Sequence, residues 1–184
     1  MEPFYKYRTL QNWKFVLDAL LKSRLYAATF EDLNDPMEGL FKCEPSLVNE
    51  RILDELHNDK KKLKICSLSR TPTNDLMWSY YADGHSGICL EIEPRGSVVV
   101  APVDYSGIAT LSESRGSEFA YTILSRKERF WQHEEESRVI TTGKYVKVKV
   151  CRVIFGRKIK KDDRALLIDL LSRLQIPKVD RIDF

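Results

Sequence analysis

Hydrophobic residues recur at helical spacing in several segments of the chain. Segment 10–22 carries apolar side chains every three or four residues, as one face of an amphipathic helix requires: Trp13, Val16, Leu17, Leu20 and Leu21. Similar spacing or a capping residue predicts further helices over 46–57, 74–82, 116–129 and 162–174. Thr73 or Asn74 is expected to cap the third of these five helices.

Alternating or continuous apolar runs predict strands between the helices. A first short strand ends at Tyr7-Arg8, and the others are expected at 24–28, 63–68, 88–92, 97–104, near Val139, at 150–155 and at 178–182. Segment 30–36 shows neither spacing. Its Asn34, Asp35 and Pro36 favour side-chain turns and an extended preceding residue, so a loop is expected there.

The predicted helices and strands interleave without a regular strand-helix alternation, and no internal repeat is present. This order predicts the α+β class, with one bent mixed sheet flanked by helices. The chain of 184 residues, 43% of them hydrophobic, is long enough for one sizeable core and short for two. We therefore expect residues 1–184 to form a single domain.

Cysteine usage and hydropathy favour a cytoplasmic protein. The four cysteines are scattered without a CxxC pair, which is typical of free thiols in a reducing compartment. Neither a leader-like apolar segment nor a run of membrane-spanning length occurs, so no membrane partner is expected.

The net charge of +3 is too small to indicate a nucleic-acid partner. Segment 141–161 nevertheless holds eight basic residues and no acid. Valines alternate there with Lys147 and Lys149, which favours a strand with its lysines in water, although a phosphate-bearing partner stays open.

The most informative chemistry lies in segment 130–140, where charged residues run into an apolar strand. Glu134, Glu136 and Arg138 are spaced two apart, so in a strand their side chains share one face. Burying them without partners costs several kcal/mol, so they are expected to line a wet cleft or to pair tightly. The alternative is a solvated edge strand with a surface ion pair.

Other polar and aromatic residues are candidates for a binding site. Ser67 and Ser69 share one face of a predicted strand, where hydroxyls can hold a ribose or simply complete a half-buried strand. Trp78 and Tyr81 have helical spacing, which more often indicates core than a stacking platform. Arg8 supplies a basic group beside Tyr7, and a surface arginine is its plain alternative.

Common catalytic motifs are absent from the sequence: GxxxxGK, GxGxxG, HExxH and GxSxG do not occur. The three histidines are far apart in the sequence. Only His133, with Glu134 and Glu136, would make a plausible carboxylate-rich metal cluster, and we expect no metal.

Together, these segments resemble the bacterial and phage DUF2971 family over almost the whole chain. The resemblance rests on ordered motifs: Tyr5-Lys6-Tyr7-Arg8, Asn34-Asp35-Pro36-Met37-Glu38, Ser67-Leu68-Ser69, Met77-Trp78 through Gly84-His85-Ser86-Gly87, Lys127 before Trp131-x-x-Glu134-x-Glu136-x-Arg138, and Val153-Ile154-Phe155-Gly156. The motif order is similar to that of ADP-ribosyltransferases, which divide an active site among three strands.

The resemblance implies an ADP-ribosyltransferase-like fold that binds NAD and transfers ADP-ribose to a nucleic acid or a protein. Glu136, Glu134 and Arg138 would be catalytic, with Glu136 stabilising the charge that develops on the ribose and Glu134 positioning the acceptor. The expected NAD-binding residues are Arg8 for the diphosphate, Ser67 for the ribose or for orienting Glu136, and Tyr7, Ser69, Trp78 and Tyr81. Two alternatives are a non-catalytic nucleotide- or partner-binding module and a toxin or nuclease-like phage-defence protein.

Overall fold

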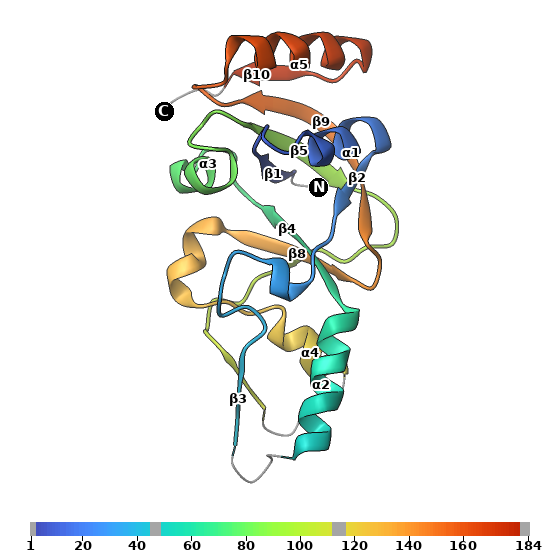
Figure 1. Cartoon of the computed structure of the whole chain (residues 1–184), viewed down its shortest axis with the longest axis vertical. Coiled ribbons are helices and arrows are strands. Elements are labelled where there is room, and N and C mark those ends of the chain that lie inside the picture. The colour runs from blue at the N-terminus through green and yellow to red at the C-terminus, as the bar shows by residue number, and fades with distance from the viewer. Residues whose placement is uncertain (1–2, 45–48, 112–116, 181–184) are drawn as a thin grey trace. The chain divides into compact units, whose positions relative to one another are not determined.

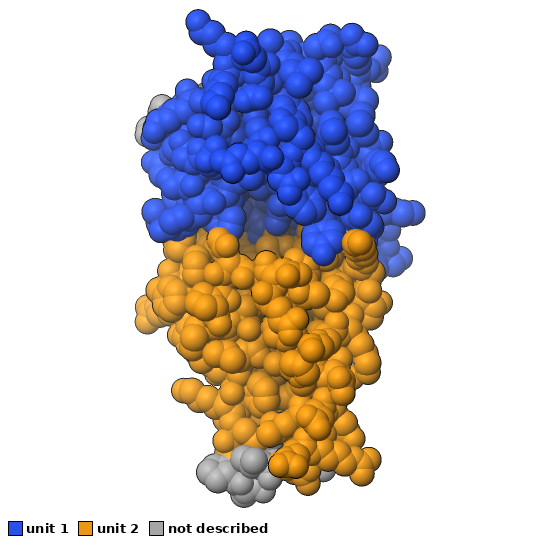
Figure 2. Space-filling model, in the orientation of Figure 1, with its two compact units in different colours: residues 1–26, 68–98, 145–184 blue, residues 27–67, 99–144 orange. Residues whose placement is uncertain are grey.

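The computed structural model describes residues 3–44, 49–111 and 117–180 and confirms the α+β class, with strands that pair mostly antiparallel (Figure 1). The chain forms two compact units (Figure 2). Unit 1 comprises Met1–Tyr26, Leu68–Val98 and Tyr145–Phe184, and unit 2 comprises Ala27–Ser67 and Val99–Lys144. A single domain stays a prediction. No helix among the described residues is long and apolar enough to cross a membrane.

The sheet of unit 1 is built around a central apolar strand. Its order is β10-β9-β5-β1, with β2 paired to the first part of β9. These strands are β1 (Phe4–Arg8), β2 (Arg24–Tyr26), β5 (Ile88–Pro94), β9 (Tyr145–Phe155) and β10 (Lys178–Asp180). Four residues of β5 are fully buried, which explains its nearly continuous apolar sequence: Ile88, Cys89, Leu90 and Ile92.

Strand β9 begins at Tyr145, five residues before the predicted start. Lys147 and Lys149 are exposed whereas Val146 and Val148 are buried, so the expected alternation is confirmed. The register against β5 shifts near Cys151, since Glu91 pairs with Arg152 and the next residue of β5 pairs with Val150. This β-bulge ends the alternation, and the last three residues of the strand, 153–155, are all buried.

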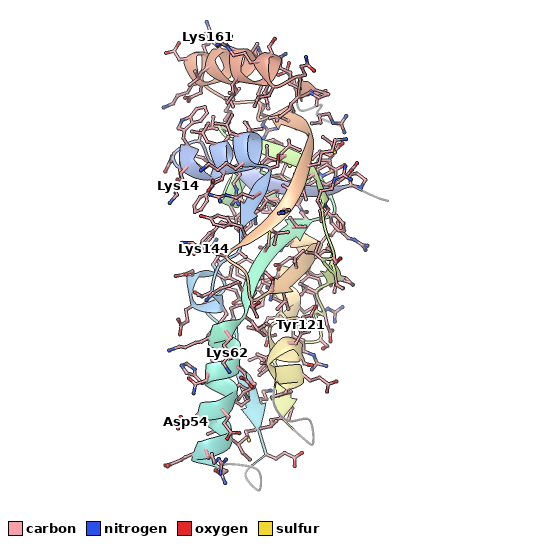
Figure 3. The ribbon with its side chains drawn as sticks, turned by 90° about the vertical axis from the view of Figure 1, so that its right-hand side faces the viewer. Lys14, Asp54, Lys62, Tyr121, Lys144 and Lys161 are labelled. Carbon is pink, nitrogen blue, oxygen red and sulfur yellow. The ribbon has the colours of Figure 1, made fainter. Side chains whose placement is uncertain are left out.

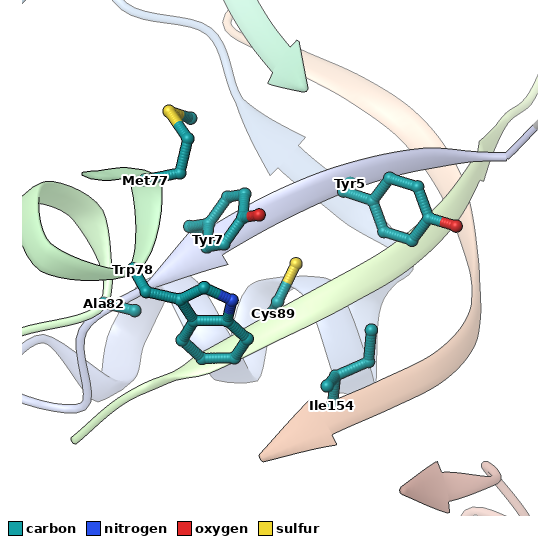
Figure 4. Packing of buried hydrophobic residues seen from close by; sticks show 7 residues of the cluster. All are labelled: Tyr5, Tyr7, Met77, Trp78, Ala82, Cys89 and Ile154. Carbon is teal, nitrogen blue, oxygen red and sulfur yellow. The ribbon is translucent and has the colours of Figure 1, made fainter. Parts of the chain in front are cut away.

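The helices of unit 1 are α1 (Trp13–Lys22), α3 (Asp75–Tyr81) and α5 (Lys161–Arg173). Asn74 caps α3 as expected, because its side-chain oxygen accepts hydrogen bonds from the backbone N–H groups of Leu76 and Met77 at 2.8 and 3.2 Å. The cap fixes the start of α3, and the apolar side of the helix packs into a core cluster (Figure 4) formed by Tyr5, Tyr7, Met77, Trp78, Ala82, Cys89 and Ile154.

Unit 2 contains two groups of strands. Strand β4 (Lys64–Ser69) is hydrogen-bonded to β8 (Glu136–Thr141), and β8 to β6 (Ala101–Pro102), whereas β3 (Phe41–Cys43) and β7 (Ala109–Leu111) pair in parallel. The last two residues of β4, Leu68 and Ser69, belong to unit 1.

In the described part of unit 2, two α-helices and two short 3₁₀ helices accompany the strands. They are α2 (Glu50–Lys62), α4 (Ser117–Ile123), η1 (Phe30–Asp32) and η3 (Arg129–Glu134). Figure 3 labels Asp54 and Lys62 on α2 and Tyr121 on α4. A core cluster combines side chains of α2, α4 and β7: Leu56, Ala109, Leu111, Phe119, Ala120 and Ile123.

Several predicted boundaries in unit 2 were wrong. Helix α2 continues through the lysines to Lys62, and the predicted residues 46–48 lie outside the described part of the chain. The predicted helix 116–129 ends at Ile123, because a bridge between Asp104 and Arg126 holds the following segment extended. The predicted strand 97–104 shrinks to Ala101–Pro102, where proline offers no N–H for a longer ladder.

Candidate functional site

The charged segment does not form one continuous strand. Glu134 is the last residue of η3, Glu135 adopts a left-handed conformation with φ of 44°, and β8 begins at Glu136. The same-face expectation therefore holds for Glu136 and Arg138, but it was wrong for Glu134, which approaches them from a helical turn. A left-handed residue reverses the chain locally, so two-residue alternation cannot extend across Glu135.

Arg138 is the centre of a buried ionic network in unit 2. Its Nε and Nη2 donate to the two Glu136 oxygens at 2.8 and 3.1 Å. Its Nη1 and Nη2 donate to the two Glu38 oxygens at 2.7 Å each, and Nη1 also donates to the Leu124 carbonyl at 2.6 Å. These five bonds match the donor capacity of a guanidinium. Arg138 is only 1% exposed, so this pairing compensates its burial.

A second cation joins the network through Glu136. The Lys127 ammonium pairs with Glu134 and lies 3.1 Å from a Glu136 oxygen. It also lies 4.7 Å from the centre of the Trp131 ring. Two cations therefore stand among three buried carboxylates, from Glu38, Glu134 and Glu136.

Two hydroxyl groups complete the surroundings of Glu136. The Ser67 hydroxyl on β4 hydrogen-bonds to the Glu136 carboxylate. The Tyr105 hydroxyl oxygen accepts a hydrogen bond from the Glu136 backbone N–H at 2.8 Å. Both the side chain and the main chain of Glu136 are thus fixed by groups from other segments.

The network shifts the proton affinities of its members in opposite directions. Burial alone would raise the pKa of Glu136, but the charges of Arg138 and Lys127 and the hydrogen bonds from Arg138 and Ser67 lower that pKa to about 2. Burial raises the pKa of Glu38, and Arg138 offsets this only in part. Burial also raises the pKa of Tyr105 to about 12, so its phenol stays protonated at neutral pH.

The structure contains the expected tight pairing, and the alternative of a surface ion pair on a solvated edge strand is wrong. Glu134 and Glu136 are 3% and 4% exposed, and the intervening strand residues Ser137 and Val139 are buried as well. Strand β8 is thus covered on both faces over Glu136 to Val139. The network therefore holds charged groups in fixed positions and leaves little of the Glu134 and Glu136 carboxylates exposed to solvent.

The aromatic candidates lie in the core of unit 1. Trp78 is 0% exposed, its Nε1 donates to the Pro72 carbonyl at 2.8 Å, and its ring stacks against His85 with centroids 6.0 Å apart. The Tyr7 ring meets Trp78 edge-on, and its hydroxyl donates to the Thr71 carbonyl at 2.8 Å. Both side chains are therefore part of the packed core of unit 1.

Three further candidates of unit 1 have local partners. Arg8 is half-buried with its guanidinium 5.3 Å from the centre of the Phe15 ring. Ser69 is buried, and its hydroxyl exchanges hydrogen bonds with the backbone of Thr71. Tyr81 is partly buried and packs against the core cluster of Figure 4.

The predicted site residues thus fall into two sets. Unit 2 brings together Ser67, Glu134, Glu136 and Arg138, whereas Tyr7, Arg8, Ser69, Trp78 and Tyr81 belong to unit 1. No role was predicted for Glu38 or Lys127, although both lie within the motifs that carry the resemblance. Two signals could have indicated these residues: Glu38 directly follows the turn 34–37, and Lys127 shortly precedes Trp131.

Possible metal ligands do not gather in the described part of the chain. No group of three or more His, Cys, Asp or Glu side chains there is arranged to hold a metal ion. His133 instead lies with its Nδ1 3.0 Å from the Phe130 carbonyl oxygen.

Comparison with known proteins gave no relative: no protein-family model, curated protein or solved structure matches this chain.

Proposed function

We propose that this protein is a nucleotide-binding module with an ADP-ribosyltransferase-like scaffold, in which Glu134, Glu136 and Arg138 organise the protein and do not react with a substrate. The supporting observation is the saturation of the network. Arg138 uses its donors within the protein, and Glu136 is bonded at both oxygens while only 4% exposed. A carboxylate that stabilises a developing charge has to meet the substrate at contact distance.

NAD is the nucleotide that we propose first, because the motif order resembles that of ADP-ribosyltransferases. The half-buried Arg8 remains the candidate for its diphosphate, since a guanidinium fork matches phosphate oxygens. The proposed location is the cytoplasm, which fits four cysteines that are all free thiols.

The second candidate is an NAD-dependent ADP-ribosyltransferase with a nucleic-acid or protein acceptor. The specific observation in its favour is the hydrogen bond from Ser67 to a Glu136 carboxylate whose pKa is lowered to about 2. Such a group is permanently charged at neutral pH, as stabilisation of an oxocarbenium-like ribose requires. In this proposal Ser67 orients Glu136, and Glu134 positions the acceptor.

The experiment that separates the two candidates measures NAD binding by calorimetry and nicotinamide release in the presence of DNA, RNA or protein. The binding module predicts heat of binding without release. Release that falls about 10²–10³-fold in Glu136→Gln would favour the transferase. The matched control is Glu135→Gln, which changes the exposed neighbouring carboxylate. Variants are compared after confirming that equal fractions are folded. Absence of binding at millimolar NAD would reject NAD as the ligand.

A further inference from the structure

A polar groove of about 440 Å³ lies within unit 2 and carries none of the residues proposed above. It is lined by Tyr105, Ser106, Gly107, Glu128, Arg129 and Gln132. Its volume falls within the range of sites for small molecules.

The walls of the groove are joined by main-chain hydrogen bonds. The Lys127 N–H donates to the Asp104 carbonyl at 3.0 Å, and the Gly107 N–H donates to the Lys127 carbonyl at 3.1 Å. Gly107 has φ of +91°, and a Cβ placed there would lie 3.6 Å from the Glu128 carboxylate. A glycine permits this conformation and leaves the space beside Glu128 open. The groove is therefore formed before any ligand arrives.

Three polar side chains of the groove have no partner among the residues that the structure describes. Among the described residues, the side chains of Glu128, Arg129 and Gln132 make no hydrogen bond and no ion pair. Arg129 and Gln132 are also exposed. A guanidinium, a carboxylate and an amide that line one groove are the kind of groups that orient a bound ligand.

We infer that this groove binds a ribonucleoside monophosphate group, with Arg129 on the phosphate and Glu128 on the ribose hydroxyls. The inference rests on the proposed nucleotide-binding function and assigns it a site and a ligand class. A guanidinium binds phosphate through paired hydrogen bonds, and a carboxylate is a common acceptor for the ribose 2′-hydroxyl. Tyr105 supplies an aromatic ring against which a base can stack.

The charge of unit 2 favours a single nucleotide over a nucleic-acid strand. Unit 2 contains 12 basic and 16 acidic residues, so its formal net charge is −4. A strand of nucleic acid needs several cations along its backbone. One phosphate needs only a local cation, and Arg129 is an exposed cation that pairs with no acidic side chain in the described part of the chain.

Calorimetric titration of the full chain with AMP, dAMP and adenosine tests the inference. AMP should bind, and Arg129→Ala should weaken AMP about tenfold or more while leaving adenosine unchanged, since only AMP carries the phosphate. Arg51→Ala, at an exposed arginine on α2 in the same unit, should not alter AMP affinity. Glu128→Gln should reduce the preference for AMP over dAMP, because dAMP lacks the 2′-hydroxyl.

Equal AMP affinities for Arg129→Ala and Arg51→Ala would overturn the groove assignment and leave nucleotide binding at another site. No binding of AMP at millimolar concentration would also overturn it, and the NAD titration would then decide separately whether the proposed function stands. AMP binding that depends on Arg129, together with nicotinamide release from NAD, would support the groove and reject the non-catalytic module.

Discussion

The aromatic core of unit 1 and the Arg138 network of unit 2 satisfy their buried polar groups by different means. In unit 1, Trp78 and Tyr7 are packed in an aromatic core and direct their polar atoms to main-chain carbonyls. In unit 2, Arg138 is buried among carboxylates and relies on other charged side chains. A side chain that donates to a main-chain carbonyl keeps its partner when a neighbouring side chain is substituted. A buried charge that is paired with charged side chains loses a partner when one of them is substituted. Single substitutions should therefore act through unpaired charge in the network and through lost packing in the aromatic core.

The units also differ in overall charge. Unit 1 contains 18 basic and 11 acidic residues, which gives a net charge of +7, against −4 for unit 2. The small net charge of the whole chain thus conceals two charged parts of opposite sign. Polyanions should be attracted to unit 1, and salt should weaken this attraction.

The largest effect is expected for Arg138→Met. This change leaves Glu38 and Glu136 buried without their main cation, so it should lower the free energy of unfolding by about 3–5 kcal/mol, toward the upper end. Urea unfolding followed by circular dichroism measures it. Arg51→Ala is the control, because its exposed pair with Glu55 should contribute no more than about 0.5 kcal/mol. A loss below about 1 kcal/mol for Arg138→Met would show that the network is not a main source of stability.

Trp78→Ala should have the next largest effect and tests the aromatic core of unit 1. Removal of a fully buried indole should cost about 3–5 kcal/mol, because it leaves a cavity and frees the Pro72 carbonyl. Tyr80→Ala on the same helix is the control, since Tyr80 is 59% exposed. A Trp78→Ala variant that melts like the parent but loses nucleotide binding would contradict the structural role.

The third prediction concerns pH and the network of unit 2. Glu136 has a pKa of about 2 in the folded protein against an ordinary value of 4.5. Its contribution to the free energy of unfolding is therefore complete at pH values above the ordinary pKa. That contribution, about 3 kcal/mol, should be lost as pH falls from about 5 to 2. The raised pKa of Glu38 acts in the opposite sense, because the folded state takes up that proton more readily.

Unfolding free energies of Glu136→Gln and Glu135→Gln, measured across this pH range, provide the check. Glu136→Gln should flatten the acid dependence, and Glu135→Gln should keep it. The same acid dependence in both variants would assign the titration to another group.

The smallest effect is expected for Ser67→Ala. It removes one hydrogen bond to an ionised carboxylate that keeps its two cations, so the expected loss is about 1–2 kcal/mol at neutral pH. The acid transition should also move upward, because that bond helps to lower the pKa of Glu136. The control is Ser106→Ala, which removes an exposed hydroxyl that donates to Asp104 at 2.9 Å. No difference between the two variants would remove Ser67 from the network.

Local patterns predicted much of the fold but only part of the site. The spacing in 10–22, the cap at Asn74 and the alternation of Lys147 with valines each act within a few residues, and each was confirmed. The pairing of Glu38 with Arg138 joins residues a hundred positions apart, which periodicity cannot reveal. Strands β3 and β7 were not predicted, and they pair with each other between segments that lie far apart in the sequence.

The division of the units along the chain bears on their order of assembly during synthesis. Every residue of unit 2 has been made once Lys144 leaves the ribosome, whereas unit 1 still lacks β9, α5 and β10. Strand β5, which has four fully buried side chains in the finished protein, must wait for β9 with one edge unpaired. Until then, an apolar strand with free main-chain groups is open to pairing with other chains. Nascent-chain aggregation should accordingly be greatest for chains arrested before residue 145 and decline once β9 has emerged.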